Sequence, residues 1–386
     1  MTQALDCQRD AFSLPTDGHY LNCAYMSPLL RVVEDAGISG LRRKRDPSVI
    51  GPDDFFQDAE RIRCLFARLV NADPTRIAIM PAASYGVSTA VRNLAIQPGR
   101  RVVMAAEQFP GNVYGWRSAV ARLGGAIDMV EPPESDHRGQ AWTARILDAI
   151  GPDTAAVTLG NVHWTDGTRF DLGAIGRRAR EVGAALVVDG TQSVGAMPFD
   201  VEEIRPDLLV CASYKWLLGP YSLALCYLGE RFDGGEPLEE TWIAREGSED
   251  FKGLVDYVDE YQPGAARFDV GERSNFILLP MQIAALEQLL EWTPEGIQRY
   301  TAELSRDMLA RAVDLGYAVE DPAWRSSHLF GIRMPPGLDL VAVKEALARR
   351  RISVSLRGQS LRVAPHLYND EGDLRALSDV LKEVRR

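Results

Sequence analysis

Short apolar runs recur along the middle of this chain, each bounded by glycine, proline or charged residues. Runs of this length, rich in valine, isoleucine, leucine and alanine, are typical of strands buried on both faces of a parallel sheet. We expect strands at 76–80, 101–105, 126–130, 155–159, 184–188, 207–212 and 222–228. Amphipathic segments between them, at 86–95, 113–123 and 171–182, predict connecting helices. The pattern therefore predicts an α/β fold with a mostly parallel central sheet and helices on both faces.

The pattern changes after residue 280. A long helix at 281–292 is expected to lead the chain out of the central sheet, and residues 295–386 show an α+β pattern. A chain of 386 residues is longer than a typical single core, so more than one domain is expected. We predict an N-terminal segment that joins the small domain, a large domain that holds the central sheet and a small C-terminal domain, at 1–52, 53–285 and 286–386.

Composition narrows the range of partners. The net charge of −11 argues against a nucleic-acid partner or an anionic membrane surface, because both need a basic face. The five cysteines form no C-x-x-C pair, so we expect neither a disulfide framework nor a metal site. No apolar run approaches about 18 residues, and the first residues lack the features of a signal peptide. We expect a cytoplasmic protein that acts on a small molecule.

Two neighbouring apolar runs each lead into a charged residue. The run 184–188 is followed by Asp189, and the run 207–212 is followed by Ser213, Tyr214 and Lys215. In open α/β sheets the ligand crevice lies beyond the carboxyl ends of the strands, so both side chains are expected to point into one crevice. A lysine forms a Schiff base with a carbonyl cofactor, and a carboxylate holds a protonated pyridine nitrogen. This pair predicts pyridoxal phosphate chemistry.

Other predicted strand ends also carry polar or aromatic residues. Ser84 stands at the start of a predicted helix, where backbone N–H groups suit a phosphate, although a plain N-cap is the alternative. Phe109 is suited to stacking on a cofactor ring, or it packs into the core as a loop residue. Asn161 is suited to donating to a phenolate oxygen, and Trp164 to walling a substrate pocket. We expect His163 to point away from the site, if the backbone there stays extended.

Gln192 follows Asp189 within reach of the same ring, and hydroxyl contacts to a phosphate are expected from Ser213 and Tyr214. Arg362 interrupts an otherwise apolar strand in the C-terminal region. A guanidinium in such a place suits a substrate carboxylate, and a structural ion pair with an acidic side chain is the alternative. Arg357 lies close by, and it either contacts a second acidic group of the substrate or is simply solvated.

Three motifs together resemble the class V aminotransferase family of fold-type I pyridoxal phosphate enzymes: Asp189-x-x-Gln192, Ser213-Tyr214-Lys215 and Leu361-Arg362-x-x-x-His366-x-Tyr368-Asn369. The family includes cysteine desulfurases, kynureninases and isopenicillin N epimerase-like proteins. The resemblance extends over nearly the whole chain, from Tyr20 to the C-terminal helix. It implies a large cofactor domain, a smaller α+β domain, an amino acid substrate and a homodimer with a shared active site.

The resemblance also implies roles for individual residues. Lys215 would carry the Schiff base and move protons, and Asp189 would keep the pyridine nitrogen protonated. Further cofactor contacts are implied for Ser84, Tyr85, Phe109, Asn161, Gln192, Ser213 and Tyr214. The loop with Ser274 and Asn275 would reach the phosphate of the neighbouring subunit. Substrate contacts are implied for Arg362, which would bind the α-carboxylate, and for Trp164, Asn22 and Tyr25.

One departure from the family bears on activity. Cysteine desulfurases carry a nucleophilic cysteine shortly before the carboxylate-binding arginine, whereas residues 352–360 contain none. Because persulfide formation needs a thiolate, ordinary desulfurase activity is disfavoured. An aminotransferase is the first expectation, and a lyase or an epimerase is the alternative. A non-catalytic binding module is disfavoured by the intact set of Lys215, Asp189 and Arg362, and a nicotinamide dehydrogenase by the absence of G-x-G-x-x-G after an early strand.

Overall fold

Seven strands form the central sheet, in the order β2-β8-β7-β6-β5-β3-β4. The computed structural model describes residues 4–135 and 137–385. The last five strands in this order are parallel, and β8 is antiparallel to both of its neighbours. The bounds are β2 Ile77–Met80, β3 Arg101–Ala105, β4 Ala126–Val130, β5 Thr154–Gly160, β6 Ala185–Asp189, β7 Leu208–Ala212 and β8 Ala224–Leu228. All seven predicted strands are present, and the predicted fold class is confirmed.

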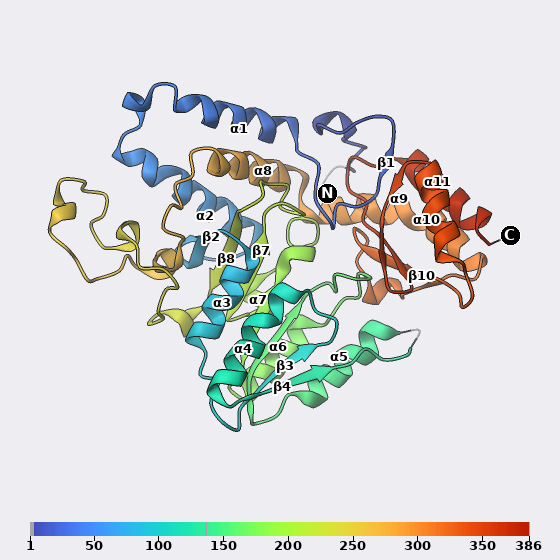
Figure 1. Cartoon of the computed structure of the whole chain (residues 1–386), viewed down its shortest axis with the longest axis horizontal. Helices are drawn as coiled ribbons and strands as arrows, with labels where there is room; N and C mark the ends of the chain where they lie inside the picture. Colours follow the sequence, from blue (N-terminus) through green and yellow to red (C-terminus); the bar gives the residue numbers. More distant parts are fainter. Residues whose placement is uncertain (1–3, 136, 386) are drawn as a thin grey trace.

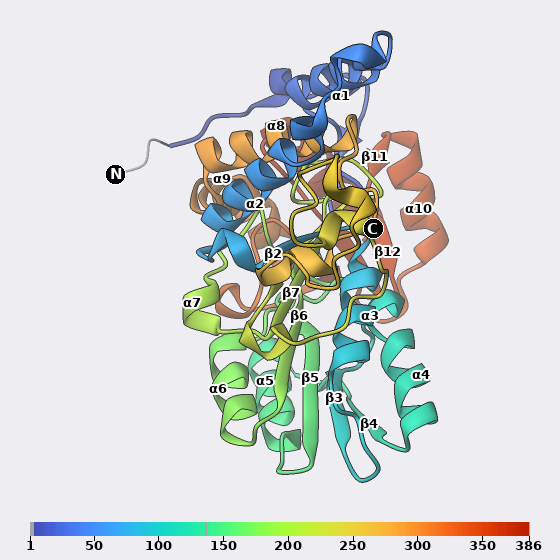
Figure 2. The ribbon, with the colours of Figure 1, turned by 90° about the vertical axis from the view of Figure 1, so that its left-hand side faces the viewer.

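Helices cover both faces of this sheet (Figure 2). Successive strand residues point to opposite faces, so Leu209 and Cys211 of β7 join one hydrophobic cluster, and Leu208 and Val210 join the other. The first cluster includes residues of α2 (Gln57–Val70), α5 (Arg138–Ala149), α6 (Leu172–Glu181) and α8 (Leu278–Trp292). The second includes residues of α3 (Ala83–Asn93) and α4 (Tyr114–Leu123). Burial on both faces explains why the strands are apolar throughout.

A second, smaller sheet forms the C-terminal part of the molecule, at the right of Figure 1. Its antiparallel order is β12-β13-β10-β9, and it packs with α10 and α11 around a separate hydrophobic cluster. The N-terminal strand β1 pairs in parallel with β11 of this region. The bounds are β1 His19–Tyr20, α9 Pro294–Asp314, β9 Ala318–Val319, β10 Phe330–Arg333, α10 Leu340–Arg349, β11 Ile352–Ser353, β12 Ser355–Arg357, β13 Ser360–Val363 and α11 Glu371–Glu383.

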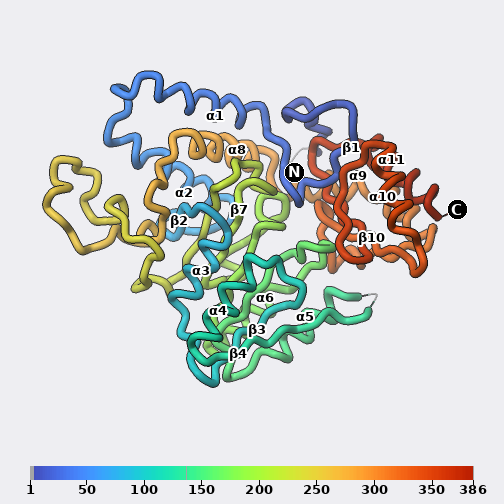
Figure 3. The backbone as a smooth tube through the Cα atoms, viewed as in Figure 1, coloured from blue at the N-terminus to red at the C-terminus, as the bar shows by residue number. Residues whose placement is uncertain are grey.

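The chain between β8 and α8 departs from the expected alternation of strands and helices. Apart from an isolated bridge between Arg245 and Tyr261, residues 229–277 hold only short 3-10 helices and loops. This segment extends away from the sheet at the left of the molecule (Figure 3). Near the N-terminus, α1 (Arg31–Arg43) packs along α8. Within the described residues, no helix is long and apolar enough to cross a membrane.

Candidate active site

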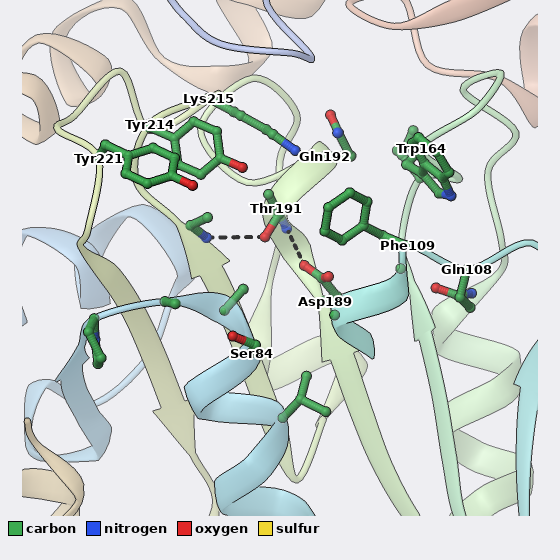
Figure 4. Close-up of a pocket in the computed structure, with 18 of the residues that line it drawn as sticks. Ser84, Gln108, Phe109, Trp164, Asp189, Thr191, Gln192, Tyr214, Lys215 and Tyr221 are labelled. Carbon is green, nitrogen blue, oxygen red and sulfur yellow. Dashed lines mark hydrogen bonds between the residues drawn. The ribbon is translucent and has the colours of Figure 1, made fainter. Parts of the chain in front are cut away.

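The carboxyl ends of β6 and β7 bring Asp189 and Lys215 to one cavity of about 340 Å³ (Figure 4). Asp189 is the last residue of β6, and Lys215 follows the end of β7 by three residues. The two strands are parallel neighbours, with Asp189 opposite Val210. The prediction that this acid and this amine share a crevice is confirmed.

Lys215 is buried, at 6% exposure, and no described carboxylate lies within ion-pair distance of its amine. Its Nζ lies 5.3 Å from the ring centroids of both Phe109 and Tyr214. Burial lowers the pKa of Lys215 from 10.5 to about 8, because it disfavours the charged form. Asp189 opposes this shift, and Arg362 and Arg357 add to it. The amine is still mostly charged near neutral pH, but its neutral fraction, the form that a nucleophile or a base needs, is far larger than that of an ordinary lysine.

The Asp189 carboxylate accepts a hydrogen bond from the backbone N–H of Thr191 at 3.0 Å. The Thr191 hydroxyl oxygen in turn accepts the backbone N–H of Ala212, at 3.1 Å, which ties the ends of β6 and β7 together. In the described part of the chain no cation forms an ion pair with Asp189. The carboxylate is thus fixed in position and still has acceptor capacity toward the cavity.

Gln192 also lines this cavity, but both ends of its amide are engaged. Its Nε2 donates to the backbone oxygen of Ala24 at 3.1 Å, and its Oε1 accepts from Trp216 Nε1 at 2.9 Å. One N–H of the amide is left for a ligand. The position of Gln192 at the site agrees with the prediction, and its contact with a ring oxygen stays a prediction.

The start of α3 forms another part of the wall. Ala82 is the N-cap residue and provides no side-chain cap, and Ala82, Ala83 and Ser84 all line the cavity. The alternative reading of Ser84 as a plain N-cap is therefore wrong. Uncapped N–H groups at the start of an eleven-residue helix, with a hydroxyl beside them, suit an anionic group. The sequence predicts an anion site from the backbone N–H groups of this helix start, and Ala82 and Ala83 line the cavity beside Ser84.

Phe109 and Trp164 form an aromatic corner, with ring centroids 5.5 Å apart and planes nearly perpendicular. Phe109 is 45% exposed and lines the cavity, so the alternative of a loop residue packed into the core is wrong. Trp164 is held by a hydrogen bond from its Nε1 to the backbone oxygen of Glu107, at 2.6 Å. Both rings line the same cavity as Lys215 (Figure 4).

His163 departs from expectation, since it is buried and lines the cavity. The expectation assumed an extended backbone, but a turn follows β5, in which the Gly167 N–H donates to the His163 backbone oxygen at 2.9 Å. The ring of His163 is paired with the Thr165 hydroxyl at 2.7 Å and with the Ala106 backbone oxygen at 3.2 Å. Tyr221 and Ser222, which precede the antiparallel β8, are further lining residues that sequence reasoning missed.

Several predicted contacts lie outside the residues that line the cavity in the single chain: Tyr85, Asn161, Ser213, Ser274, Asn275, Asn22, Tyr25 and Arg362. The hydroxyls of Tyr85 and Ser213 are buried, and residues 4–135 and 137–385 offer them no hydrogen-bond partner. The Ser274 hydroxyl donates to the Phe55 backbone oxygen, and Asn275 Oδ1 accepts the N–H groups of residues 277 and 278. Cofactor and substrate roles for these residues stay predictions.

Arg362 is 1% exposed, and its partners are all neutral. Its Nη1 donates to the Trp164 backbone oxygen at 2.9 Å, and its Nη2 lies 3.3 Å from Ser355 Oγ and 3.4 Å from Asn22 Oδ1. Among the described residues no carboxylate pairs with this guanidinium, so the alternative of a structural ion pair is wrong. Burial lowers the pKa of Arg362 to about 10. A buried cation without a counter-ion favours binding of an anion.

These groups fit pyridoxal phosphate. The cavity supplies an amine with a lowered pKa, a carboxylate with spare acceptor capacity, a helix N-terminus and an aromatic wall. Gln108, which also lines it, has a buried Nε2 with no hydrogen-bond partner among the described residues. Each group matches one functional part of the cofactor: the carbonyl, the pyridine nitrogen, the phosphate and the ring face.

Comparisons with known proteins agree with this chemistry. Residues 52–243 match the family model for class V aminotransferases. The chain is similar to the uncharacterized aminotransferase YcbU of Bacillus subtilis, with 27% identity over 84% of this chain and 83% of that protein. It is also similar to isopenicillin N epimerase of Streptomyces clavuligerus, with 24% identity over 82% of this chain and 81% of that protein. A structure of mutant C-DES with glycine covalently linked to its PLP cofactor superposes with a TM-score of 0.85 and 20% identity, over 97% of this chain and 98% of that one.

Proposed function

The chain belongs to the class V aminotransferase family of pyridoxal phosphate enzymes, and from this membership we propose that it is an aminotransferase, which moves the amino group of an amino acid onto a keto acid. The observation that carries the proposal is the buried Lys215 amine, which shares one cavity with the Asp189 carboxylate. The alternative within the family is a lyase or an epimerase. The experiment below distinguishes the two.

Each group around the cavity has a task in this proposal. When bound, the cofactor ring withdraws electrons from the substrate Cα, so that a bond at this carbon breaks more easily. Lys215 would hold the carbonyl end of the cofactor and, once released, would take up and return the Cα proton on Nζ. Asp189 would keep the pyridine nitrogen protonated. The start of α3, with Ser84, would hold the phosphate, and Phe109 would face the ring.

The electrostatics of Lys215 suit proton transfer. A general base works best when its pKa lies close to the working pH, and burial brings the pKa of Lys215 down to about 8. An ordinary lysine, with a pKa of 10.5, would be almost fully charged at neutral pH. Arg362 would orient the substrate through its α-carboxylate, so that the Cα–H bond faces Nζ.

Ordinary cysteine desulfurase activity is not proposed, because the site offers no reactive thiol. None of the described residues that line the cavity is a cysteine, and the hairpin of β12 and β13 is short and contains none. Cys23 is the cysteine that interacts electrostatically with Lys215, but it is fully buried, and burial raises its pKa to about 12. A thiol in this state is not a nucleophile near neutral pH.

The visible absorption of the loaded enzyme tests the proposal. A single amino acid is added, and after the cofactor band has been lost a keto acid is added. The proposal predicts that the band stays lost until the keto acid restores it, since the amino group remains on the cofactor. A band that returns unaided, with a new product, would show a lyase or an epimerase instead.

Variants of two lysines control for the fold. Lys215→Ala is expected to abolish turnover and leave the circular dichroism spectrum unchanged. Lys344→Ala changes an exposed lysine on α10 and is expected to behave like the wild type. Substantial turnover by Lys215→Ala would rule out the assignment of the catalytic amine.

A further inference from the structure

Two arginines share one face of the small antiparallel sheet. In the pairing of β12 with β13, Ser355 lies opposite Arg362, and Arg357 lies opposite Ser360. Residues two apart on a strand point to the same face, as do residues directly opposite each other. Arg357 and Arg362 are therefore diagonal neighbours on one face. Like charges in such a position repel each other unless an anion compensates them.

Neither arginine has a carboxylate partner in the described protein. The Nη1 of Arg357 donates to the backbone oxygen of Leu356 at 3.0 Å, and the Nε atoms of both arginines are buried with no partner in the part of the chain that the structure describes. The pKa of Arg362 is lowered to about 10, first by burial and then by the charge of Arg357. Because the unsatisfied donors and the repulsion both cost free energy, this face favours a ligand that supplies negative charge.

Trp164 connects both arginines to the cavity. The guanidinium carbon of Arg357 lies 5.2 Å from the centroid of the Trp164 ring, and Arg362 donates to the Trp164 backbone oxygen. Trp164 itself lines the cavity that holds Lys215 (Figure 4). Both arginines also lower the pKa of Lys215, which places their charges near its amine. Neither arginine lines the cavity itself, but both guanidinium groups lie against Trp164, which forms part of its wall.

One α-carboxylate occupies only one of these two groups. Arg362 is the deeper of the two, and it is already oriented by Asn22, Ser355 and Trp164, so it suits the carboxylate common to all amino acids. Arg357 is less buried, at the edge strand of the sheet, and its guanidinium donates a hydrogen bond to the backbone of its own strand. Its position, farther out along the same face, suits a group at the end of the substrate side chain.

From this arrangement we infer that Arg357 binds a second carboxylate, and that the substrate is an amino acid with an acidic side chain. The inference rests on the proposed function, since it assumes an amino acid in this cavity. It makes Arg357 a specificity-determining residue. An Arg357 that is only stacked on Trp164 and solvated would give no preference for an acidic side chain.

Matched substrates and variants test the inference. Aspartate and asparagine differ in side-chain charge at nearly constant size, as do glutamate and glutamine. We expect the wild type to favour the acids in kcat/KM. Arg357→Gln should lower kcat/KM for the acids about 10- to 100-fold and change it little for the amides, because a hydrogen bond to a charged group is lost. Arg357→Lys should keep part of the preference.

Arg349→Gln is the matched control, because Arg349 lies on α10 and is ion-paired with Glu383 at the surface. It should leave the ratio of acid to amide unchanged. A ratio that Arg357→Gln also leaves unchanged would overturn the inference. A wild type that favours the amides would overturn it as well.

A binding measurement separates failure of this inference from failure of the proposed function. Succinate and glutarate should raise the Tm of the loaded enzyme more than butyrate and valerate, and Arg357→Gln should remove the difference. If no amino acid is converted but the diacids still raise the Tm more than the monoacids, the proposed function is wrong, and the binding of two carboxylates by Arg357 and Arg362 is supported. If amino acids are converted and the diacids give no greater stabilisation, only the inference is wrong.

Discussion

Replacing Lys215 by methionine should stabilise the cofactor-free protein at neutral pH. Lys215 is buried, and no described carboxylate forms an ion pair with it, so its charged form is costly when no cofactor is bound. Methionine has a similar length and no charge, and it keeps the packing against Phe109 and Tyr214. The substitution therefore separates the free energy lost by burying the charge from the free energy of packing the side chain.

The lowered pKa sets the magnitude and the pH range. Burial lowers the pKa of Lys215 from 10.5 to about 8, and one pKa unit corresponds to about 1.4 kcal/mol, so the charge costs about 3 kcal/mol. Below pH 8 the amine is charged in both the folded and the unfolded state, and the whole cost is present. Between pH 8 and 10.5 the folded state loses its proton first and the cost fades. Above pH 10.5 the amine is neutral in both states.

Urea unfolding of the wild type and of Lys215→Met between pH 6 and 10.5 measures the difference in their free energies of unfolding. The titration of the groups that both proteins share cancels in this difference. Lys215→Met should be more stable by up to about 3 kcal/mol below pH 8, and the advantage should disappear toward pH 10.5. Lys344→Met, at an exposed site, should show no such advantage. A difference between Lys215→Met and wild type that does not change with pH would refute the reasoning.

A direct titration of the amine checks the same pKa. The chain contains five lysines, and the four besides Lys215 are exposed: Lys44, Lys252, Lys344 and Lys382. Carbon-13 methylation of the lysines gives few NMR signals, and the signal that is absent in Lys215→Met identifies Lys215. Its midpoint should lie near pH 8, and a midpoint near 10.5 would contradict the proposed effect of burial.

Three further substitutions have expected outcomes. Asp189→Asn should abolish turnover and, since the Asp189 charge raises the pKa of Lys215, should move the NMR midpoint of Lys215 below 8. Arg362→Gln should raise KM for amino acids about 10- to 100-fold with a smaller change in kcat, and an unchanged KM would make the arginine structural. Gly167→Ala should lower the free energy of unfolding by about 2 kcal/mol or more, because φ is +76° and the added Cβ would overlap the carbonyl oxygen before β10. Gly337→Ala, with φ of +82° and open space, should cost only about 1 kcal/mol, and equal losses in urea unfolding would contradict this account.

The central sheet and the placing of Asp189 and Lys215 in one cavity were predictable from the sequence for a physical reason. Strands buried on both faces must be apolar throughout, so their ends are visible as the first polar residue after each run. Asp189 and Lys215 are such residues, and parallel neighbouring strands end at one edge of the sheet. The segment 229–277 was less predictable, because it has few regular elements and therefore no periodic pattern.

Side-chain direction beyond the strand ends was not predictable. The position of His163 depends on a turn that begins just after β5. A change in backbone direction there decides which side chains point into the cavity and which point away from it. Tyr221 and Ser222 line the cavity from the loop before β8, where no strand end marks them. The partners of Arg362 lie far away in sequence, at Asn22 and Trp164. A single strand pattern contains no information about such contacts.

The charges around the cavity explain how an acidic protein can select anions. The chain carries a net charge of −11, so its surface as a whole does not attract anionic ligands. At the site, however, the described residues place Lys215, Arg357 and Arg362 against a single unpaired carboxylate, that of Asp189. This local excess of positive charge is only partly exposed to solvent, where the lower dielectric strengthens it. On the proposed function, selectivity for a phosphate and for carboxylates would therefore arise inside the cavity, after the ligand has entered, and not from attraction at long range.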